Sequence, residues 1–404
     1  MNILYLNHYA GSPALGMEYR PYYLAREWVR AGHQVQMLAA DFSHVRAQQP
    51  PAGDSVVDGI GYRFYPTPPY AGNGLGRVRN IGAFLRAVWR DTARLVREFR
   101  PDVVIASSTY PMDIWVARRI ARRCKARLVY EVHDLWPLSP MELSGMSRWH
   151  PFIVLVQAAE DAAYRHADRV ISMLPKVHGY MASRGLDLRK LAIVPNGITL
   201  DEWDGEPPPL RDDVACALDG PGTVVGYAGS MGLPNALDTL LDAAALLRGR
   251  DALRFVLVGS GHERARLAQR IADEGLVNVT LLPPIPKAMI PSFLARVHIA
   301  YIGWQRVPIY RFGIAPNKLM DYMMARCVVL HSVEAGNDPV AEAACGLTVP
   351  PQDAAAVAAG LRQLAALPAE ARRAMGERGR AFVLANHTYP VLAQRFLQAV
   401  EGAR

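Results

Sequence analysis

Cysteine is scarce in this chain, which has only four cysteines among its 404 residues: Cys124, Cys216, Cys327 and Cys345. No two of them stand in a Cys-x-x-Cys pair, so the sequence predicts neither a zinc knuckle nor a disulfide framework. Such sparse usage is typical of proteins in a reducing compartment such as the cytosol.

Long apolar runs are also missing, because no stretch approaches the ~20 residues that a membrane-spanning helix needs. Met1 leads directly into the strand-like segment Asn2–Leu6, so we expect no signal peptide. The expectation is a soluble or peripheral protein of the cytoplasm. Hydrophobic residues still make up 51% of the chain, enough for sizeable cores, and its length predicts two or three domains.

Acidic residues are few between Arg77 and Arg127, which holds 13 Lys or Arg and only 4 Asp or Glu. This balance of +9 exceeds the +8 of the whole chain, so the remainder sums to −1. Segment 77–99 reads as an amphipathic helix, with Val78 and Trp89 on the side expected to face the core. Four arginines fall within about 20° of one line on the other side: Arg79, Arg86, Arg90 and Arg97. This face meets either solvent alone or an anionic surface such as lipid headgroups. Nucleic acid is disfavoured, because these arginines lack interleaved aromatic residues.

Strand-like apolar segments alternate with helix-like segments over residues 2–194, and the pattern restarts over 223–365. Strands that are apolar throughout are expected where helices cover both faces of a parallel sheet. Between the two halves lies DEWDGEPPPLRDD, residues 201–213, whose three consecutive prolines predict a linker. The sequence therefore predicts an α/β protein with two doubly wound Rossmann-like domains, 1–200 and 201–387, facing each other across a cleft.

The segment FGIAPNKLMDYMMAR, from Phe312 to Arg326, predicts a helix with an anion site at its start. Pro316 suits the first helical turn, whose free N–H groups and positive dipole end favour an anion. Lys318 adds a cation in the same turn, and Asp321 lies three residues later on the same face. A diphosphate at the helix start and sugar hydroxyls on Asp321 fit this pattern. The alternative is an ordinary surface helix.

Loops after predicted strands are further candidates, because ligands in such sheets bind beyond the carboxyl ends of the strands. The first such loop contains Gly11 and Gly16 but no Gly-x-Gly-x-x-Gly fingerprint, which argues against a dinucleotide dehydrogenase. His133 follows the predicted strand Arg127–Val132 and is either a ligand contact or a structural histidine.

Two glycine-containing loops in the second half are candidate phosphate sites. The loop GSMGLPNALD begins at Gly229, where backbone N–H groups and the Ser230 hydroxyl can donate to an anion. The loop GSGHER places Gly261 before a helix, as either a second anion site or only a tight strand-to-helix turn.

In order along the chain, these motifs resemble those of retaining GT-B glycosyltransferases of family four. The matching motifs are GHQV (Gly32 to Val35), VPNGI (Val194 to Ile198), YAGSMG (Tyr227 to Gly232), VGSG (Val258 to Gly261) and the helix carrying Asp321. The segments HYAGSP, GMEYRPYYLAREW and PNKLMDYMMA resemble a bacterial O-antigen and capsule branch that includes N-acetyl-L-fucosamine transferases.

The resemblance implies that the first domain binds the acceptor and the second binds a nucleotide-sugar donor. It also implies that a last helix, at about 388–404, packs back on the first domain. Glu18 or Arg20 would hold the acceptor, and His133 would act in catalysis by hydrogen-bonding the donor sugar. The implied donor-binding residues are Gly16, Gly229, Ser230, Gly261, Asn317, Lys318 and Asp321, with Asp321 on the nucleotide ribose.

Two departures from the family pattern bear on the donor. Gly313 stands where the family has a glutamate that contacts sugar hydroxyls, which disfavours an ordinary D-hexose and suits a deoxysugar or an inverted hydroxyl pattern. The family's phosphate-binding arginine and lysine are also replaced, the lysine by Asn235. Lys318 would then neutralise the diphosphate, a role that suits a lysine point charge, with Arg306 or Arg311 as further candidates.

Retention in this family is attributed to attack on the same face of the sugar, with the leaving phosphate accepting the proton of the acceptor. No side-chain nucleophile is then needed. The chain has no Asp-x-Asp tripeptide, so we expect no metal cofactor. Two alternatives stay open: a non-hydrolysing UDP-sugar epimerase, and a catalytically silent partner that only binds nucleotide sugars.

The branch also implies a biological setting. The donor is expected to be a UDP-sugar, such as UDP-N-acetyl-L-fucosamine, and the acceptor an undecaprenyl-diphosphate-linked saccharide in lipopolysaccharide O-antigen or capsule synthesis. That acceptor lies at the anionic inner leaflet of the bacterial cytoplasmic membrane. We therefore predict peripheral membrane association through Arg79, Arg86, Arg90 and Arg97.

Overall fold

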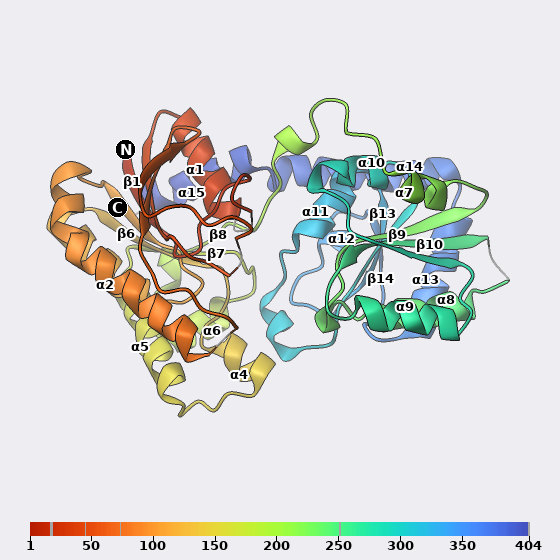
Figure 1. Cartoon of the computed structure of the whole chain (residues 1–404), viewed down its shortest axis with the longest axis horizontal. Coiled ribbons are helices and arrows are strands. Elements are labelled where there is room, and N and C mark those ends of the chain that lie inside the picture. The colour runs from red at the N-terminus through yellow and green to blue at the C-terminus, as the bar shows by residue number, and fades with distance from the viewer. Residues whose placement is uncertain (17–18, 45, 73, 250–251, 403–404) are drawn as a thin grey trace. The chain divides into compact units, whose positions relative to one another are not determined.

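The computed structural model describes residues 1–16, 19–44, 46–72, 74–249 and 252–402 (Figure 1). The chain divides into two compact units. Unit 1 comprises Met1–Asn196 with Tyr389–Arg404, and unit 2 comprises Gly197–Thr388. Each unit has its own apolar core.

Unit 1 is built on an eight-stranded sheet in the order β3-β4-β2-β1-β5-β6-β7-β8. Every neighbouring pair is parallel except β3 and β4, which form an antiparallel hairpin. Its strands are β1 (Asn2–Leu6), β2 (Gln34–Ala40), β3 (Gly53–Val57), β4 (Ile60–Tyr65), β5 (Val103–Ala106), β6 (Arg127–Val132), β7 (Arg169–Ser172) and β8 (Leu191–Ile193). Strands β1, β5 and β6 are buried almost throughout, as expected for parallel strands with helices on both faces.

Helices cover both faces of this sheet. The helices of unit 1 are α1 (Tyr19–Arg30), α2 (Leu75–Glu98), α3 (Asp113–Cys124), α4 (Leu138–Ser144), α5 (Pro151–His166), α6 (His178–Ser183) and α15 (Tyr389–Glu401). In Figure 1, α1 and α15 lie together on one side, with α2 and α5 on the other. Trp28 of α1 donates its indole N–H to the carbonyl of Ala393 and packs edge-on against Phe396. These contacts fix α15, the last helix of the chain, in unit 1.

Unit 2 has a six-stranded parallel sheet in the order β11-β10-β9-β12-β13-β14. Its strands are β9 (Thr223–Ser230), β10 (Leu253–Ser260), β11 (Val279–Leu282), β12 (Ile299–Gly303), β13 (Val328–Ser332) and β14 (Gly346–Thr348). Its helices are α7 (Asp212–Leu218), α8 (Leu237–Leu246), α9 (Arg264–Asp273), α10 (Ile290–Leu294), α11 (Asn317–Met324), α12 (Pro339–Glu342), α13 (Ala354–Ala366) and α14 (Ala369–Asn386). Successive residues of β9, such as Val224 and Val225, enter different core clusters, because side chains alternate between the faces of a sheet.

The predicted class, two Rossmann-like α/β domains, is confirmed. The division between the units falls after Asn196, four residues before the predicted boundary, and residues 201–213 belong to unit 2. Prolines lack a backbone donor but keep their carbonyl acceptors. Ser292 donates to the carbonyl of Pro208, and Arg211 donates to the carbonyl of Pro284. These bonds tie the proline-rich segment to unit 2.

Among the described residues, no helix is both long enough and apolar enough to cross a membrane.

Candidate functional site

In unit 1, His133 follows β6 at the carboxyl edge of the sheet. Its Nε2 lies 2.9 Å from the Ser107 hydroxyl oxygen and 3.5 Å from Oε2 of Glu131. The Ser107 hydroxyl donates its one proton to Glu131 over 2.7 Å. Ser107 therefore accepts from His133, which puts a proton on Nε2 of that ring.

Glu131, on β6, is the centre of this network and is fully buried. Besides Ser107, its carboxylate accepts from the Tyr5 hydroxyl at 2.5 Å and from Nε of Arg20 at 2.9 Å. Burial by itself would raise the pKa of Glu131. The Arg20 charge and the hydrogen bonds of His133 and Tyr5 outweigh burial and hold that pKa well below its usual range. The group is thus a buried, fully satisfied anion.

Arg20 was predicted to bind the acceptor, and the structure corrects this assignment. The side chain is 5% exposed, and its two terminal nitrogens donate to the carbonyls of Pro195 and Val194. With Nε on Glu131, every guanidinium nitrogen has a partner within unit 1. Arg20 thus joins the carboxyl edge of the sheet to the segment after β8. The other predicted acceptor residue, Glu18, lies outside the described residues.

Gly16 was predicted to offer its backbone N–H to the donor diphosphate, but that N–H donates to the carbonyl of Ser12 at 3.0 Å. Its φ of +82° favours glycine. A Cβ at this position would also lie 3.0 Å from Ala47. Gly16 therefore shapes the loop after β1, and a phosphate contact through its N–H is not supported.

In unit 2, helix α11 begins at Asn317 with Pro316 as its N-cap, one residue later than predicted. Lys318 Nζ donates to the Tyr227 hydroxyl at 2.9 Å and to Oδ1 of Asn235 at 2.6 Å. It also lies 4.6 Å from the centre of the Tyr227 ring. Asn235 replaces the lysine implied by the family pattern, so Lys318 brings a cation to the same place from another helix.

Lys318 also lies over the glycine loop after β9. A Cβ at Gly229 would be 3.3 Å from Lys318 Nζ, and the Tyr227 hydroxyl donates to the carbonyl of Ser230. The structure thus brings the predicted residues Gly229, Ser230 and Lys318 together. Burial lowers the pKa of Lys318 to about 8, and no acidic residue contributes to that shift.

Two further glycines let β9 and β10 end side by side. A Cβ at Gly261 would fall 2.3 Å from the carbonyl oxygen of Met231, and one at Gly259 would fall 1.9 Å from that of Gly229. Side chains at these positions would push the two strand ends apart. Gly261, a predicted donor residue, therefore has a packing role whether or not it meets a ligand.

Asp321 lies on α11 beyond Lys318 and is 8% exposed. Both of its carboxylate oxygens accept from Lys287 Nζ at 2.7 Å, and Glu202 lies 3.4 Å from the same nitrogen. Burial raises the pKa of Asp321, and the Lys287 charge opposes that rise. A ribose hydroxyl that binds Asp321 must share the carboxylate with Lys287. Sequence reasoning missed Lys287, because it precedes Asp321 by 34 residues and carries no motif.

Three other predicted donor residues are Asn317, Arg306 and Arg311. Asn317 is exposed as the first residue of α11. Arg306 pairs with Glu334 at 3.0 Å. Arg311 donates to the carbonyl of Pro308 and stacks on Phe312. Lys318 is the one of the three proposed cations that lies at the glycine loop in this structure.

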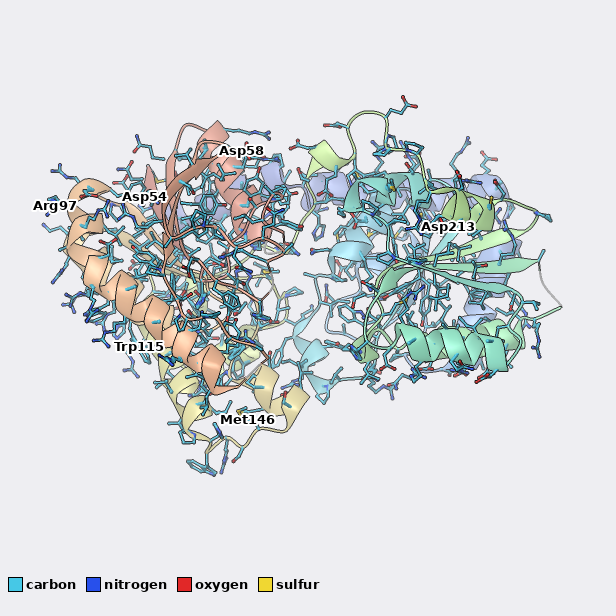
Figure 2. All side chains as sticks on the ribbon, viewed as in Figure 1. Asp54, Asp58, Arg97, Trp115, Met146 and Asp213 are labelled. Atoms are coloured by element: carbon cyan, nitrogen blue, oxygen red, sulfur yellow. The ribbon has the colours of Figure 1, made fainter. Side chains whose placement is uncertain are left out.

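The basic face of α2 is exposed at all four predicted arginines: Arg79, Arg86, Arg90 and Arg97. Arg97 pairs with Glu98 at 3.4 Å and points away from unit 1 in Figure 2. On the opposite side Ile81, Val88 and Leu95 are buried as predicted. Val78 and Trp89 are not, since each is about 40% exposed. The Trp89 ring stacks under the Arg119 guanidinium, 4.2 Å away, which explains how an indole is tolerated there.

Known proteins resemble this chain over most of its length. The protein WcaI of Escherichia coli strain K12, assigned as a colanic acid biosynthesis glycosyl transferase, is 23% identical over 284 residues. The match covers 67% of this chain and 68% of WcaI.

Three solved structures share the whole fold. Sucrose-phosphate synthase from Thermosynechococcus elongatus superposes with a TM-score of 0.76 at 19% identity, covering 100% of this chain and 99% of that one. HepE of Anabaena, solved with UDP and glucose, has a TM-score of 0.67 at 15% identity, with 99% of both chains covered. WaaG, described as a glycosyltransferase of lipopolysaccharide biosynthesis, has a TM-score of 0.67 at 15% identity, covering 99% and 100%.

Two family descriptions match the chain, one in each unit. "Glycosyl transferase 4-like domain" matches residues 16–197, and "Glycosyl transferases group 1" matches residues 222–366. The first range falls almost wholly in unit 1 and the second lies within unit 2. Together with the GT-B fold of its structural neighbours, these matches make the chain a glycosyltransferase that joins a 4-like domain to a group 1 domain.

Proposed function

We propose that this glycosyltransferase transfers a sugar from a UDP-sugar, with retention of configuration, to a lipid-linked saccharide in bacterial surface polysaccharide synthesis. The observation that carries the proposal is the Lys318 cation above the glycine loop of unit 2, with Asp321 one turn further along α11. A cation at the start of a helix suits a diphosphate, and a carboxylate one turn further on suits ribose hydroxyls.

The donor class is supported by two further findings. The structurally similar protein HepE was solved with UDP-glucose, at a TM-score of 0.66. WcaI and WaaG are described in colanic acid and lipopolysaccharide biosynthesis. We propose an N-acetylated deoxyhexosamine such as N-acetyl-L-fucosamine as the sugar, because Gly313 offers no carboxylate to the hydroxyls of an ordinary hexose.

The proposed mechanism needs no protein nucleophile. The acceptor hydroxyl attacks the anomeric carbon on the face that the diphosphate leaves, and the leaving phosphate takes the hydroxyl proton. Lys318 and the first turn of α11 stabilise the negative charge that grows on the diphosphate. We propose that Lys318 takes the place of a metal ion here, so a chelator should leave the rate unchanged.

His133 is proposed to hydrogen-bond the donor sugar while positive charge develops on the sugar ring. Glu131 and Ser107 hold this imidazole at the sheet edge with Nε2 protonated. An orientation fixed before the reaction avoids a reorganisation cost in the transition state. Glu131 and Ser107 therefore act as positioning residues.

The acceptor is proposed to be an undecaprenyl-diphosphate-linked saccharide at the inner leaflet of the cytoplasmic membrane. The protein would meet that surface through the exposed arginines of α2. Each basic residue near an anionic leaflet contributes about 1 kcal/mol of attraction. The placement is peripheral and cytoplasmic.

The test is a panel of UDP-sugars, scored first by thermal shift and then by product. A ligand at 100 times its Kd adds about 2.7 kcal/mol to stability, so donors of the right class should raise the melting temperature most. The best donor should then yield UDP and an α- or β-linked product that keeps the donor's anomeric configuration. Release of an isomeric UDP-sugar without acceptor, or UDP-sugar binding without turnover, would refute the transferase mechanism.

A further inference from the structure

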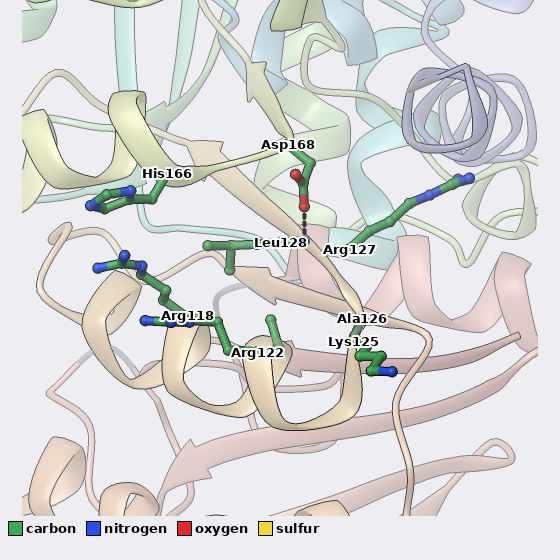
Figure 3. A pocket seen from close by; sticks show the side chains of 9 residues that line it. Arg118, Arg122, Lys125, Ala126, Arg127, Leu128, His166 and Asp168 are labelled. Carbon is green, nitrogen blue, oxygen red and sulfur yellow. Dashed lines mark hydrogen bonds between the residues drawn. The ribbon is translucent and has the colours of Figure 1, made fainter. Parts of the chain in front are cut away.

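Unit 1 has a second basic feature, a surface pocket of about 470 Å³ at the amino-terminal edge of its sheet (Figure 3). It lies where α3 and α5 end and where β6 and β7 begin. His133 follows the other end of β6, so a strand of six residues, roughly 17 Å long, separates the pocket from the candidate transfer site.

Three basic side chains gather in this pocket from two helices. Arg118 and Arg122 come from α3 and His166 from the end of α5. In Figure 3 both guanidinium groups lie on the same side of the pocket as the imidazole, while Lys125 and Arg127 point elsewhere. Within the part of the chain that the structure describes, none of the three side chains makes a hydrogen bond or an ion pair.

Negative charge does not balance this cluster. Asp168 is the one carboxylate that lines the pocket, and it accepts from the backbone N–H of Leu128 at 2.8 Å. Partial burial, followed by the charges of Arg118, Arg165, Lys190 and Arg122, lowers the pKa of His166. The positive charge of Arg118 and Arg122 therefore disfavours protonation of His166, and an incoming anion would relieve that repulsion.

Helix dipoles explain only part of this arrangement. Basic residues are favoured in the last turn of a helix, where backbone carbonyls lack partners. Arg122 and His166 fit that rule. Arg118 lies six residues before the end of α3, beyond the last turn, and still lines the pocket. A pair of guanidinium forks beside an imidazole suits the oxygens of a phosphate group, which arginine binds in a bidentate manner.

We propose that this pocket binds a phosphate group, at a site separate from the sugar-transfer site and independent of it. The phosphate belongs either to the headgroup of an anionic lipid or to a soluble phosphate compound. Both sources present the same oxygens, so the pocket chemistry is common to them. The test below separates the two sources.

The experiment measures the pKa of the His166 imidazole by NMR in the full chain, with His166→Gln used to assign the resonance. In wild type, inorganic phosphate should raise this pKa by roughly one unit relative to chloride at matched ionic strength. Arg118→Gln with Arg122→Gln should abolish the response and weaken phosphate binding at least tenfold. Arg373→Gln with Arg380→Gln, on α14, removes the same charge elsewhere and should leave the response intact.

Binding to vesicles shows whether the phosphate belongs to a lipid headgroup or to a soluble compound. If the Arg118/Arg122 variant loses binding to phosphatidylglycerol vesicles while wild type keeps it, the ligand is a lipid headgroup. If both bind these vesicles equally and only the response to inorganic phosphate differs, the ligand is soluble. A wild-type His166 pKa that is the same in phosphate and chloride would overturn the proposal. So would an equal loss of response in the α14 control. Neither result depends on whether the protein transfers sugar.

Discussion

At the carboxyl edge of the unit 1 sheet a buried anion is surrounded by donors, whereas in unit 2 a largely buried cation meets, among the described residues, only neutral oxygens. Glu131 has Arg20, Tyr5 and Ser107 around it. Lys318 has Tyr227 and Asn235. Opposite charges that are fully paired hold a structure rigid, while a buried charge without a counterion is destabilising and attracts one.

This difference suggests two roles: the unit 1 network positions a side chain, and the unit 2 site binds an anion. In unit 1 the charge of Glu131 is compensated by neighbouring protein groups, and this network fixes the position of His133. The unit 2 site leaves its charge uncompensated, which lowers stability but favours a diphosphate. Stability and function are therefore expected to respond in opposite directions at the two edges.

Removal of the unit 1 anion should have the largest effect. Glu131→Ala leaves Arg20 buried without its partner, which costs about 3–5 kcal/mol in comparable buried pairs. Denaturant unfolding of the variant, followed by a probe in unit 1, should show this loss. The double variant Arg20→Met/Glu131→Leu should recover much of it, because both charges are then gone. An unchanged unfolding midpoint for Glu131→Ala would contradict the comparison.

Removal of the unit 2 cation, Lys318, should instead raise the free energy of unfolding. A lysine pKa of about 8 in place of 10.5 corresponds to about 3 kcal/mol, so Lys318→Met should stabilise unit 2 by up to that amount at pH 7. The folded state holds its proton less tightly than the unfolded state, so unfolding takes up a proton between pH 8 and 10.5. The penalty in wild type is therefore full below pH 8 and fades as the pH rises to 10.5. The stability gap between variant and wild type should close over that window.

The affinities for UDP and uridine test whether the Lys318 charge binds the diphosphate. Lys318→Ala should weaken UDP by roughly 1.5–3 kcal/mol, the value of a charged hydrogen bond, while uridine, which lacks the diphosphate, loses little. Wild-type affinity for UDP should fall as the pH rises above 8, where Lys318 loses its proton. Lys318→Arg stays charged and should show a flatter pH profile. Calorimetry with both ligands decides, and equal losses for UDP and uridine would remove Lys318 from the phosphate site.

His133 tests whether the unit 1 network serves catalysis. His133→Ala should lower kcat by roughly 10- to 100-fold with UDP affinity nearly constant, since the lost hydrogen bond forms in the transition state. Steady-state kinetics and UDP titration separate the two quantities. A variant that folds and turns over at the wild-type rate would make His133 a structural residue.

The α2 face lies outside both sites, and its effect should be confined to membrane binding and be the most salt-sensitive. Arg86→Glu with Arg90→Glu should weaken binding to anionic vesicles by at least roughly 30-fold, because the two lost arginines contribute about 1 kcal/mol each and the new carboxylates repel the surface. High salt should abolish wild-type binding. Transfer to a water-soluble acceptor should survive. Arg373→Glu with Arg380→Glu is the charge-matched control. Equal co-sedimentation of all three proteins would leave α2 as an ordinary solvated helix.

Local patterns predicted most of the parallel strands and most of the helices, because a strand buried on both faces is apolar throughout and an amphipathic helix repeats its apolar residues. The parallel strands β4 and β14 were not predicted. The exposed hairpin strand β3 escaped prediction, since four of its five residues are solvent-exposed and it carries no apolar run. The bonds that tie the proline-rich segment to unit 2 could not be predicted, because the carbonyl acceptors of Ser292 and Arg211 lie far from these residues in the sequence.

The sequence by itself determined the fold class, the start of α11 to within one residue, and the placing of Lys318 and Asp321 on one helix, since these depend on residues close together in the chain. Only the tertiary structure shows which residues pair with the buried charged groups. Lys287 reaches Asp321 across 34 residues, and Arg20 reaches Glu131 across 111. The charge of a buried group depends on such distant neighbours, because pKa and hydrogen bonding are set by the few ångströms around an atom. The separation of two residues in the sequence does not indicate how close they lie in space.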